Sequence, residues 1–201
     1  MIRTVVFDIG GVLVDWNPHH LYRQLIADDE ARERFLTDIC PQSWNEQQDA
    51  GRSVAAATAE RVALFPQHAD LIRAYYGRWE EMLGGPVAGT PALLERLHAQ
   101  KTPLYALTNW SAELFPIGRR RFGFLDRFRG IVVSGEEGVI KPDSEIFAIL
   151  CQRHDLSPAE CLFIDDNPAN VAAAAALGFS AHRFTDAASL EQCLIGHGLL
   201  R

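Results

Sequence analysis

The sequence predicts an α/β fold, in which a parallel sheet carries helices on both faces and a helical segment is inserted after the first strand. Three observations lead to this prediction. From Pro86 onward, short apolar runs alternate with segments of helical periodicity, an order typical of βαβ units. An apolar strand, residues 4–7, stands near the N-terminus. Between Trp16 and Gly85 the pattern is helical, and we find no convincing strand there.

The predicted strands are short apolar runs, several of which end at an acid, an asparagine or a glycine. Parallel strands buried on both faces are typically such continuous apolar runs. The five predicted strands are residues 4–7, 103–109, 130–135, 161–165 and 180–184.

Each later strand is preceded or followed by a helical pattern. Thr90 and Pro91 have the form of an N-cap and a first-turn proline, and the helix they begin has leucines on one side. Ser157 and Glu160 have the spacing of a capping box. Further helices are predicted from near Ser111, over residues 141–155, over residues 167–178 with Gly178 closing the helix, and from about 186 to 195.

The segment after the first strand is too long for a loop. Residues 19–39 and 55–65 have apolar side chains at helical spacing, so the segment has apolar faces of its own. We therefore expect an α/β core domain, residues 1–16 and 86–201, and a helical cap domain, residues 17–85.

The composition excludes several classes of protein. The formal net charge of -7 argues against a nucleic-acid partner, which needs a basic face. No apolar stretch approaches the ~20 residues of a membrane span, and no secretory signal is visible. The four cysteines form no CxxC pair and the seven histidines no zinc motif. We expect a cytoplasmic protein without a membrane partner, either a monomer or a homodimer.

Chemically active side chains follow the strands of the predicted sheet. Ligands of open α/β sheets bind outside the carboxyl ends of the strands. Those ends carry Asp8, then Thr108 and Asn109, then Lys141 in the loop after the third strand, and then the pair Asp165 and Asp166. An acid, a hydroxyl, an ammonium group and a paired acid at successive strand ends suit attack on a phosphoryl group.

The roles of these groups follow from their charges. Asp8 can act as a carboxylate nucleophile that forms an aspartyl-phosphate. Because a phosphate dianion repels that carboxylate, a divalent cation is needed, and Mg²⁺ prefers carboxylates, carbonyls and waters. Asp8, a backbone carbonyl and Asp166 would supply those ligands. Thr108 and Lys141 can bind the transferring oxygens and neutralise their charge.

Four motifs at these positions resemble the haloacid dehalogenase-like (HAD) hydrolase superfamily. They are FDIGGVLVD, ALTN, VIKPDSEIF and FIDDNPANV. The inserted segment is similar to the helical C1 cap of one branch, in particular that of α-D-glucose-1-phosphate phosphatase-like proteins. The resemblance implies a Rossmann-like three-layer core with the HAD fold, and a catalytic Asp8 and Lys141. It also implies that phosphate is bound by Thr108, Asn109 and Lys141. Magnesium would be bound by Asp8, Asp166 and the Gly10 carbonyl. Asp165 would act on the metal through water or from the second shell.

Gly10 departs from the family pattern, because most of the phosphatases have an aspartate at this position as general acid and base. The backbone carbonyl survives in glycine, whereas the acid does not. General acid–base help is typically worth about 10²–10⁴ in rate. A leaving group of low pKa, such as an anomeric sugar oxygen, needs less of it. Asp15, His19 or His20 could replace the acid, although a turn role for Asp15 and a surface or hinge role for the histidines are the favoured interpretations.

Several residues keep two interpretations. Asn167 and Asn170 can hydrogen-bond to the acids, and Asn167 can instead be an N-cap. Trp16 and Trp110 contact either the substrate or the core. The stretch WNEQQDAGR, residues 44–52, either sets substrate specificity, with Arg52 available to a second anion, or contains a plain interhelical turn, which is the favoured interpretation.

Three functions are consistent with these features. The first is a Mg²⁺-dependent phosphatase that hydrolyses a small phosphorylated metabolite, a sugar phosphate in particular, through an aspartyl-phosphate. The second is a 2-haloacid dehalogenase-type hydrolase, whose halide leaves without a proton and so needs no acid at position 10. The third is a catalytically weak binding or regulatory protein, motivated by Gly10.

Overall fold

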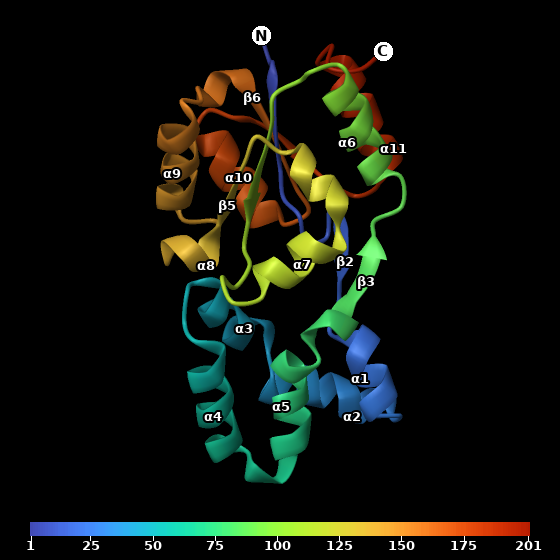
Figure 1. The fold of residues 1–201 in the computed structure, drawn as a ribbon, viewed down its shortest axis with the longest axis vertical. Helices are drawn as coiled ribbons and strands as arrows, with labels where there is room; N and C mark the ends of the chain where they lie inside the picture. The colour runs from blue at the N-terminus through green and yellow to red at the C-terminus, as the bar shows by residue number, and fades with distance from the viewer.

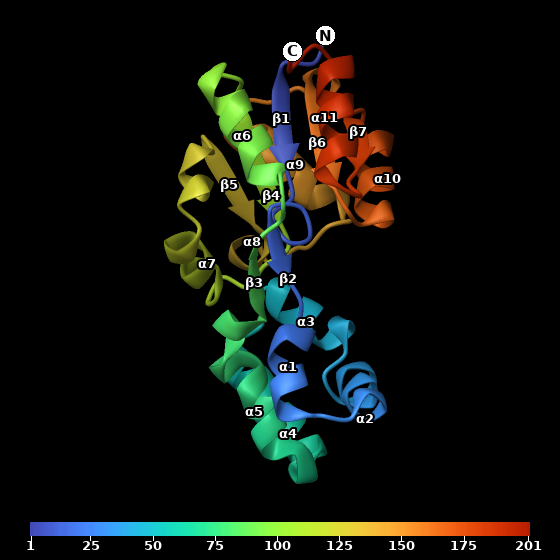
Figure 2. The ribbon, with the colours of Figure 1, turned by 90° about the vertical axis from the view of Figure 1, so that its right-hand side faces the viewer.

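The computed structural model describes residues 1–201 and has a five-stranded parallel sheet at its centre (Figures 1 and 2). The strand order is β5-β4-β1-β6-β7. The strands are β1 (Thr4–Phe7), β4 (Leu104–Thr108), β5 (Gly130–Val133), β6 (Cys161–Asp165) and β7 (Ser180–Arg183). The predicted parallel sheet is confirmed, with strand bounds that differ from the predicted ones by at most two residues.

The sheet is covered on both faces because alternate side chains of its strands face opposite ways. Val5 and Phe7 of β1 pack with leucines of α6 and α11, whereas Val6 packs with the apolar side chains of α9 and α10. These helices are α6 (Thr90–Ala99), α9 (Ser144–His154), α10 (Pro168–Ala176) and α11 (Ala187–Gly196). The result is the three-layer α/β core that the sequence predicts.

Shorter elements complete this part of the chain. They are α7 (Phe115–Arg121), α8 (Ser134–Glu137) and two 3₁₀ turns, Gly123–Arg127 and Pro158–Glu160. None of the helices combines the length and the apolar character that crossing a bilayer requires.

A group of helices lies beyond the carboxyl ends of the strands, at one end of the elongated molecule (Figures 1 and 2). Its core is a cluster of aromatic rings that includes Tyr22, Trp44, Tyr75 and Tyr76. The group comprises α1 (His19–Leu25), α2 (Asp29–Arg34), a π-helical turn (Phe35–Ile39), α3 (Gln42–Asp49), α4 (Val54–Leu64), a 3₁₀ turn (Pro66–His68), α5 (Ala69–Gly77) and a 3₁₀ turn (Trp79–Met82).

A two-stranded antiparallel ribbon joins this helical group to the sheet. It consists of β2 (Val14–Trp16) and β3 (Leu83–Pro86). The expectation that no strand occurs between Trp16 and Gly85 is therefore wrong. The sequence LGGP of β3 has no β-branched residue and no alternation, so its extended conformation depends on pairing with β2 rather than on its own propensity.

Three local predictions are also corrected. The helix predicted from near Ser111 begins at Phe115, after a turn. Gly89, not Thr90, is the N-cap of α6, and Thr90 makes no capping bond. Ser157 likewise makes no capping bond, because Glu160 pairs with Arg3 instead of closing a capping box.

Close packing of α8 against the loop after β4 depends on Gly135. A Cβ atom at this position would lie 2.3 Å from the Ala112 amide nitrogen and 2.8 Å from the Trp110 carbonyl oxygen. Both contacts are with backbone, which cannot rotate away. We predict that Gly135→Ala lowers the free energy of unfolding by about 1–3 kcal/mol, measured by urea denaturation. Gly123→Ala is the matched control, because nothing lies within 4 Å of its Cβ position; equal loss in both variants would contradict this account.

Candidate active site

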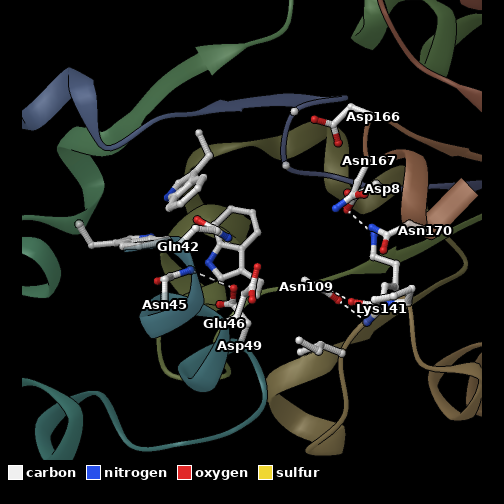
Figure 3. A pocket seen from close by; sticks show the side chains of 17 residues that line it. Asp8, Gln42, Asn45, Glu46, Asp49, Asn109, Lys141, Asp166, Asn167 and Asn170 are labelled. Carbon is white, nitrogen blue, oxygen red and sulfur yellow. Dashed lines mark hydrogen bonds and ion pairs between the residues drawn. The ribbon is translucent and has the colours of Figure 1, made fainter. Parts of the chain in front are cut away.

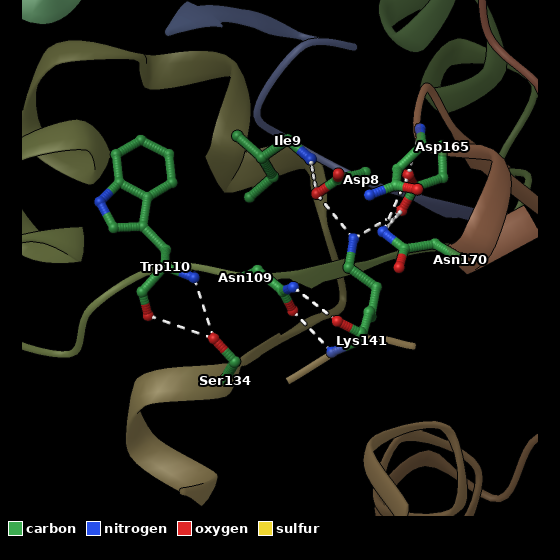
Figure 4. A network of polar contacts seen from close by, with 9 residues as sticks. Asp8, Ile9, Asn109, Trp110, Ser134, Lys141, Asp165 and Asn170 are labelled. Carbon is green, nitrogen blue, oxygen red and sulfur yellow. Dashed lines mark hydrogen bonds and ion pairs between the residues drawn. The ribbon is translucent and has the colours of Figure 1, made fainter. Parts of the chain in front are cut away.

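The carboxyl ends of neighbouring strands bring the predicted residues to one edge of the sheet. Phe7 of β1 pairs with Ile164 of β6, so Asp8 and Asp165 follow at the same level. Asn109 follows β4 on the other side of β1. Lys141 reaches the same place from the loop before α9. Figure 4 shows that Asp8, Lys141 and Asp165 point toward one another.

Lys141 lies between two carboxylates. Its Nζ atom is 3.0 Å from Asp8 Oδ1 and 2.7 Å from Asp165 Oδ2. The side chains of Lys141 and Asp165 are fully buried, and that of Asp8 is 11% exposed. Removing one member of such a buried group leaves an uncompensated charge, which typically costs about 3–5 kcal/mol. The lysine therefore holds the ends of β1 and β6 together electrostatically.

Burial and charge oppose each other at this group. Burial raises the pKa of Asp8 to about 7, although the Lys141 ammonium group lowers it. Burial alone would lower the pKa of Lys141, but the charges of Asp8 and Asp165 outweigh burial and raise it above its ordinary value. Lys141 is thus a permanent cation, whereas the charge of Asp8 depends on what else binds beside it.

The two acids of the pair Asp165 and Asp166 have different surroundings. Besides Lys141, Asp165 accepts hydrogen bonds from the Asn167 amide at 2.9 Å and from Asn170 Nδ2 at 3.0 and 3.1 Å. Asp166 is exposed toward a cavity. Burial and the neighbouring Asp165 carboxylate raise the pKa of Asp166. Asp165 is therefore held by protein donors, and Asp166 is free to take a ligand.

The two asparagines after β6 have separate roles. Asn167 accepts a hydrogen bond from the Ala169 amide and caps α10. Asn170 donates to both oxygens of Asp165. Both interpretations left open by the sequence are thus realised, each by one residue.

The glycine loop after β1 leaves a carbonyl and a space beside these acids. The bridge between Gly10 and Val14 consists of two hydrogen bonds: the Gly11 amide donates to the Val14 carbonyl, and the Val14 amide donates to the Ile9 carbonyl. No backbone amide donates to the Gly10 carbonyl. Gly11 has a φ of +73°, and a Cβ atom there would lie 2.5 Å from Asp166 Oδ2. Glycine is therefore required at position 11 for the loop to pass this close to the acid.

One oxygen from each of three acids could bind a single cation. Oxygens of Asp8, Asp165 and Asp166 all lie within 4.8 Å of one another. Carboxylate oxygens together with a free carbonyl are hard ligands of the kind that Mg²⁺ prefers. The donor set therefore fits a magnesium ion, with Asp165 the least available because Lys141 and Asn170 already occupy it.

Thr108 and Asn109 have different surroundings. The Thr108 hydroxyl is fully buried, has no hydrogen-bond partner and does not line the cavity beside Asp8, so its requirement for an acceptor is unmet. The Asn109 side chain is engaged with the backbone of Lys141, donating to its carbonyl oxygen at 3.0 Å and accepting from its amide at 2.8 Å. Asn109 thus fixes the position of Lys141.

A cavity of about 410 Å³ extends from these residues to the helical group. Figure 3 shows Asp8, Asp166 and Lys141 at one end and α3 at the other. Its wall from the helical side consists of Trp16, Gln42, Asn45, Glu46, Asp49 and Trp79, and Trp110 lines it from the core. Sequence reasoning missed Gln42, Asn45, Glu46, Asp49 and Trp79 as individual residues. The polar stretch WNEQQDAGR was the available signal for three of them.

Some sequence candidates do not line this cavity. His20 pairs with Asp15 at 2.8 Å, and His19 Nε2 lies 3.5 Å from Glu33. Arg52 pairs with Glu60 and donates to Gln47 at 2.7 Å. Both contacts of Arg52 are therefore within the helical group. This agrees with a plain interhelical turn, and it leaves Arg52 already paired rather than free for a second anion.

Asp49 is the buried acid of the helical wall. Its side chain accepts from Asn45 Nδ2 at 2.9 Å, and its carbonyl accepts from the Ser134 hydroxyl at 2.6 Å. The residue as a whole is only 5% exposed. Burial raises the pKa of its carboxyl group to about 7; the Ser111 amide lowers it and Glu46 raises it further. Asp49 joins α3 to the loops that follow β4 and β5.

A family model described as haloacid dehalogenase-like hydrolase matches residues 2–178. Sesquiterpene phosphatase astK of Aspergillus oryzae is 30% identical over 204 residues, covering 96% of this chain and 93% of that protein. Validoxylamine A 7'-phosphate phosphatase of Streptomyces hygroscopicus subsp. limoneus is 24% identical, covering 89% of this chain and 83% of that protein.

Solved structures share the fold at low sequence identity. A HAD-like family hydrolase of Porphyromonas gingivalis has a TM-score of 0.74 at 24% identity, covering 100% of this chain and 99% of that one. A HAD family enzyme of Bacteroides thetaiotaomicron, solved with magnesium and inorganic phosphate, has a TM-score of 0.68 at 22% identity, covering 92% and 96%. L-2-haloacid dehalogenase of Xanthobacter autotrophicus has a TM-score of 0.63 at 21%, covering 98% and 83%. The fold therefore does not separate phosphatases from dehalogenases.

The raised pKa of Asp49 predicts a pH-dependent effect of Asp49→Asn. Between the ordinary carboxyl pKa of 3.8 and about 7, the folded chain holds a proton that the unfolded chain releases, so this group's contribution to stability falls as pH rises through that window. Without metal, the Asp49→Asn variant and the wild type should have nearly the same free energy of unfolding at pH 4. At pH 8, the free energy of unfolding of the variant should be higher by roughly 1–3 kcal/mol. Chemical denaturation in a chelator measures this gain; a difference between the two proteins that stays constant with pH would contradict it.

Proposed function

The chain belongs to the haloacid dehalogenase-like hydrolases, and on that premise we propose that it is a Mg²⁺-dependent phosphatase that hydrolyses a small phosphorylated metabolite, a sugar phosphate in particular. One observation carries the proposal. A buried ammonium group, Lys141, bridges Asp8 and Asp165, while Asp166 and the Gly10 carbonyl remain available on the cavity side. The site is thus arranged for one more cation and an anionic substrate. The relatives in Aspergillus oryzae and Streptomyces hygroscopicus are named as phosphatases.

The metal ligands we propose are Asp8, Asp166 and the Gly10 carbonyl, with Asp165 contributing through water. Bound there, Mg²⁺ would supply the positive charge that lets a phosphate dianion approach a carboxylate and that stabilises the transferring group. A HAD family enzyme of the same fold has been solved with magnesium and phosphate.

The nucleophile is one oxygen of Asp8. Its Oδ1 is 3.0 Å from Lys141 Nζ and accepts a hydrogen bond from the Ile9 amide at 2.7 Å, whereas no hydrogen bond from the protein restrains Oδ2. We assign the attack to Oδ2. A bond forms between Oδ2 and phosphorus as the bond to the leaving oxygen breaks, giving an aspartyl-phosphate and an oxyanion, which takes a proton from solvent water to become the alcohol. Water then attacks phosphorus and gives up a proton to solvent, and the bond between phosphorus and Oδ2 breaks to release inorganic phosphate and the Asp8 carboxylate.

Two further groups contact the transferring phosphoryl oxygens in this proposal. Lys141 keeps its charge because both neighbouring carboxylates favour the ammonium form. The unpartnered Thr108 hydroxyl donates to one oxygen. Asn109 acts through Lys141, whose backbone it holds. Fixed charges and dipoles of this kind account for most of the catalysis expected in phosphoryl transfer.

Gly10 limits the choice of leaving group. No acid stands at this position to protonate the leaving oxygen, and the histidines near the turn are paired with Asp15 and Glu33 outside the cavity. The proposed substrates are therefore esters whose leaving oxygen has a low pKa, such as a sugar phosphorylated at its anomeric carbon.

We also propose that residues 17–85 act as a cap domain over a core of residues 1–16 and 86–201. The ribbon of β2 and β3 connects the two parts. The cavity is lined from both sides, which supports a role for the cap in closing the site and choosing the substrate.

Dehalogenation is the weaker alternative. A 2-haloacid carries a carboxylate, which needs a cationic partner in a cavity. The only basic side chain that lines this cavity is Lys141, and without a metal ion its single charge is outnumbered by the acids around it. The acids Asp8, Glu46, Asp49 and Asp166 line the same cavity and would repel such a substrate.

The proposal predicts turnover of p-nitrophenyl phosphate only with Mg²⁺, because this ester's leaving group needs little protonation. Asp8→Asn should lower turnover at least ~10³-fold, since it removes the nucleophile, while leaving the circular dichroism spectrum unchanged. Turnover that is equally fast in a chelator, or that survives Asp8→Asn, would contradict the proposal. Chloride release from 2-chloropropionate without metal would support the alternative.

A second prediction concerns the missing acid. Nothing lies within 4 Å of a Cβ atom built on Gly10, and its φ is not in the left-handed region, so Gly10→Asp fits without displacing a neighbour. With the acid restored, hydrolysis of an alkyl phosphate should accelerate at least ~10-fold, because its leaving group needs a proton. Hydrolysis of p-nitrophenyl phosphate should change much less. Steady-state kinetics on both esters measures the difference, and equal effects on the two would show that the lost proton donor is not what limits the enzyme.

A further inference from the structure

The end of the cavity that faces away from Asp8 is a separate recognition surface. Figure 3 shows Asp8 and Asp166 at one end and Asn45, Glu46 and Asp49 at the other. The last three belong to one helix, α3. A phosphate bound beside Asp8 therefore directs its leaving group toward this helix.

We propose that this α3 wall selects phosphomonoesters whose leaving group carries several hydroxyl groups and is uncharged or bears an amine, and that it rejects leaving groups with a second anion. The inference rests on the proposed phosphatase function and adds to it the chemistry of the leaving group.

The charges at the α3 end support rejection of a second anion. Glu46 and Asp49 line the wall, and no basic side chain lines the cavity except Lys141. Lys141 is fully buried between Asp8 and Asp165, so it offers no free charge at the far end. A second phosphate or a carboxylate there would be desolvated beside two acids without a partner.

Hydrogen-bonding groups at the same end favour hydroxyls and amines. Glu46 is half-buried, and its carboxylate can only accept hydrogen bonds when ionised. Hydroxyl and ammonium groups are the donors that it lacks. Gln42 also lines the cavity and is exposed, so its side-chain amide can donate to hydroxyl oxygens and accept from hydroxyl groups.

The wall is held in place before any ligand binds. Tyr76 donates to Asn45 at 3.1 Å and accepts from Gln48 at 2.7 Å, and Asn45 in turn donates to Asp49. On the opposite side, Trp110 packs so closely on α7 that a Cβ atom at Gly118 would lie 2.8 Å from its ring. A wall fixed by such contacts loses little entropy on binding, which favours selective recognition.

The same wall disfavours a hydrocarbon leaving group. An isoprenoid chain would bury the half-exposed Glu46 carboxylate without giving it a hydrogen-bond partner, which is costly. The relative in Aspergillus oryzae is named a sesquiterpene phosphatase. The structure assigns this chain a different kind of leaving group, in spite of that similarity.

The test compares kcat/KM for four phosphomonoesters with Mg²⁺, each divided by the value for p-nitrophenyl phosphate. They are a hexose 1-phosphate, a hexosamine 1-phosphate, a hexose 1,6-bisphosphate and farnesyl monophosphate. We expect the first two to exceed the last two at least ~10-fold. A bisphosphate or a farnesyl ester that matches or exceeds the neutral sugar would overturn the inference.

Variants connect this preference to the wall. At pH 8, above the pKa of about 7 for Asp49, Glu46→Gln combined with Asp49→Asn should raise the ratio of bisphosphate to monophosphate kcat/KM at least ~10-fold, because at that pH it removes the two repelling charges. Asp38→Asn is the matched control, since Asp38 is an exposed acid of the helical group outside the cavity, and it should keep the wild-type ratio.

An unchanged ratio in the double variant, with circular dichroism showing a folded protein, would overturn the inference while metal-dependent turnover of p-nitrophenyl phosphate still supported the phosphatase function. Absence of any metal-dependent turnover would instead overturn the phosphatase function and this inference together.

Discussion

The ion pairs of Lys141 with Asp8 and Asp165 are the interaction on which the rest of the site depends. Three charged groups from three separate segments of the chain are buried together, which is stable only while each charge has its partners. The lysine keeps two acids close in the absence of any other cation, and Asn109 and Asn170 hold the lysine and Asp165 in turn. Lys141 is the only cation beside the three acids Asp8, Asp165 and Asp166, so the cluster as a whole is negatively charged. This negative charge is the reason that we expect the site to bind a divalent cation and, through that cation, a phosphate.

The helical group turns this charged edge into an enclosed cavity. It joins the sheet through the ribbon of β2 and β3 and touches the core through Asp49, whose carbonyl accepts from Ser134. One end of the cavity thus contains Asp8, Asp166 and Lys141, and the other contains the polar side chains of α3 (Figure 3). In our proposal, this division lets different segments of the chain set the reaction chemistry and the choice of substrate. The proposal assigns the choice of substrate to the charge of α3 rather than to the shape of the sheet edge.

The sequence predicted the sheet and its carboxyl edge well because both depend on local patterns. A buried parallel strand is a continuous apolar run; the acids and the asparagine lie at the ends of such runs, and the lysine lies in the segment after the third run. The ribbon strand β3 could not be found in this way, since LGGP is extended only because β2 pairs with it. The wall formed by Asn45, Glu46 and Asp49 was also missed, because these residues look like the polar face of a surface helix. Only the packing of α3 against the loops after β4 and β5 shows that they are buried. Arg52 illustrates the reverse case, because an isolated arginine beside a glycine turn gives no sign of its pairing with Glu60.

The central claim is that Asp8 is a nucleophile whose carboxylate becomes phosphorylated during turnover. The most direct measurement is rapid acid quenching of the protein during hydrolysis of p-nitrophenyl phosphate with Mg²⁺, followed by mass spectrometry of its peptides. The account predicts one phosphoryl group on the peptide that contains Asp8, present only when the metal is present and absent from the Asp8→Asn variant. Steady turnover with no phosphoryl group on that peptide, or with the group on a different residue, would contradict it.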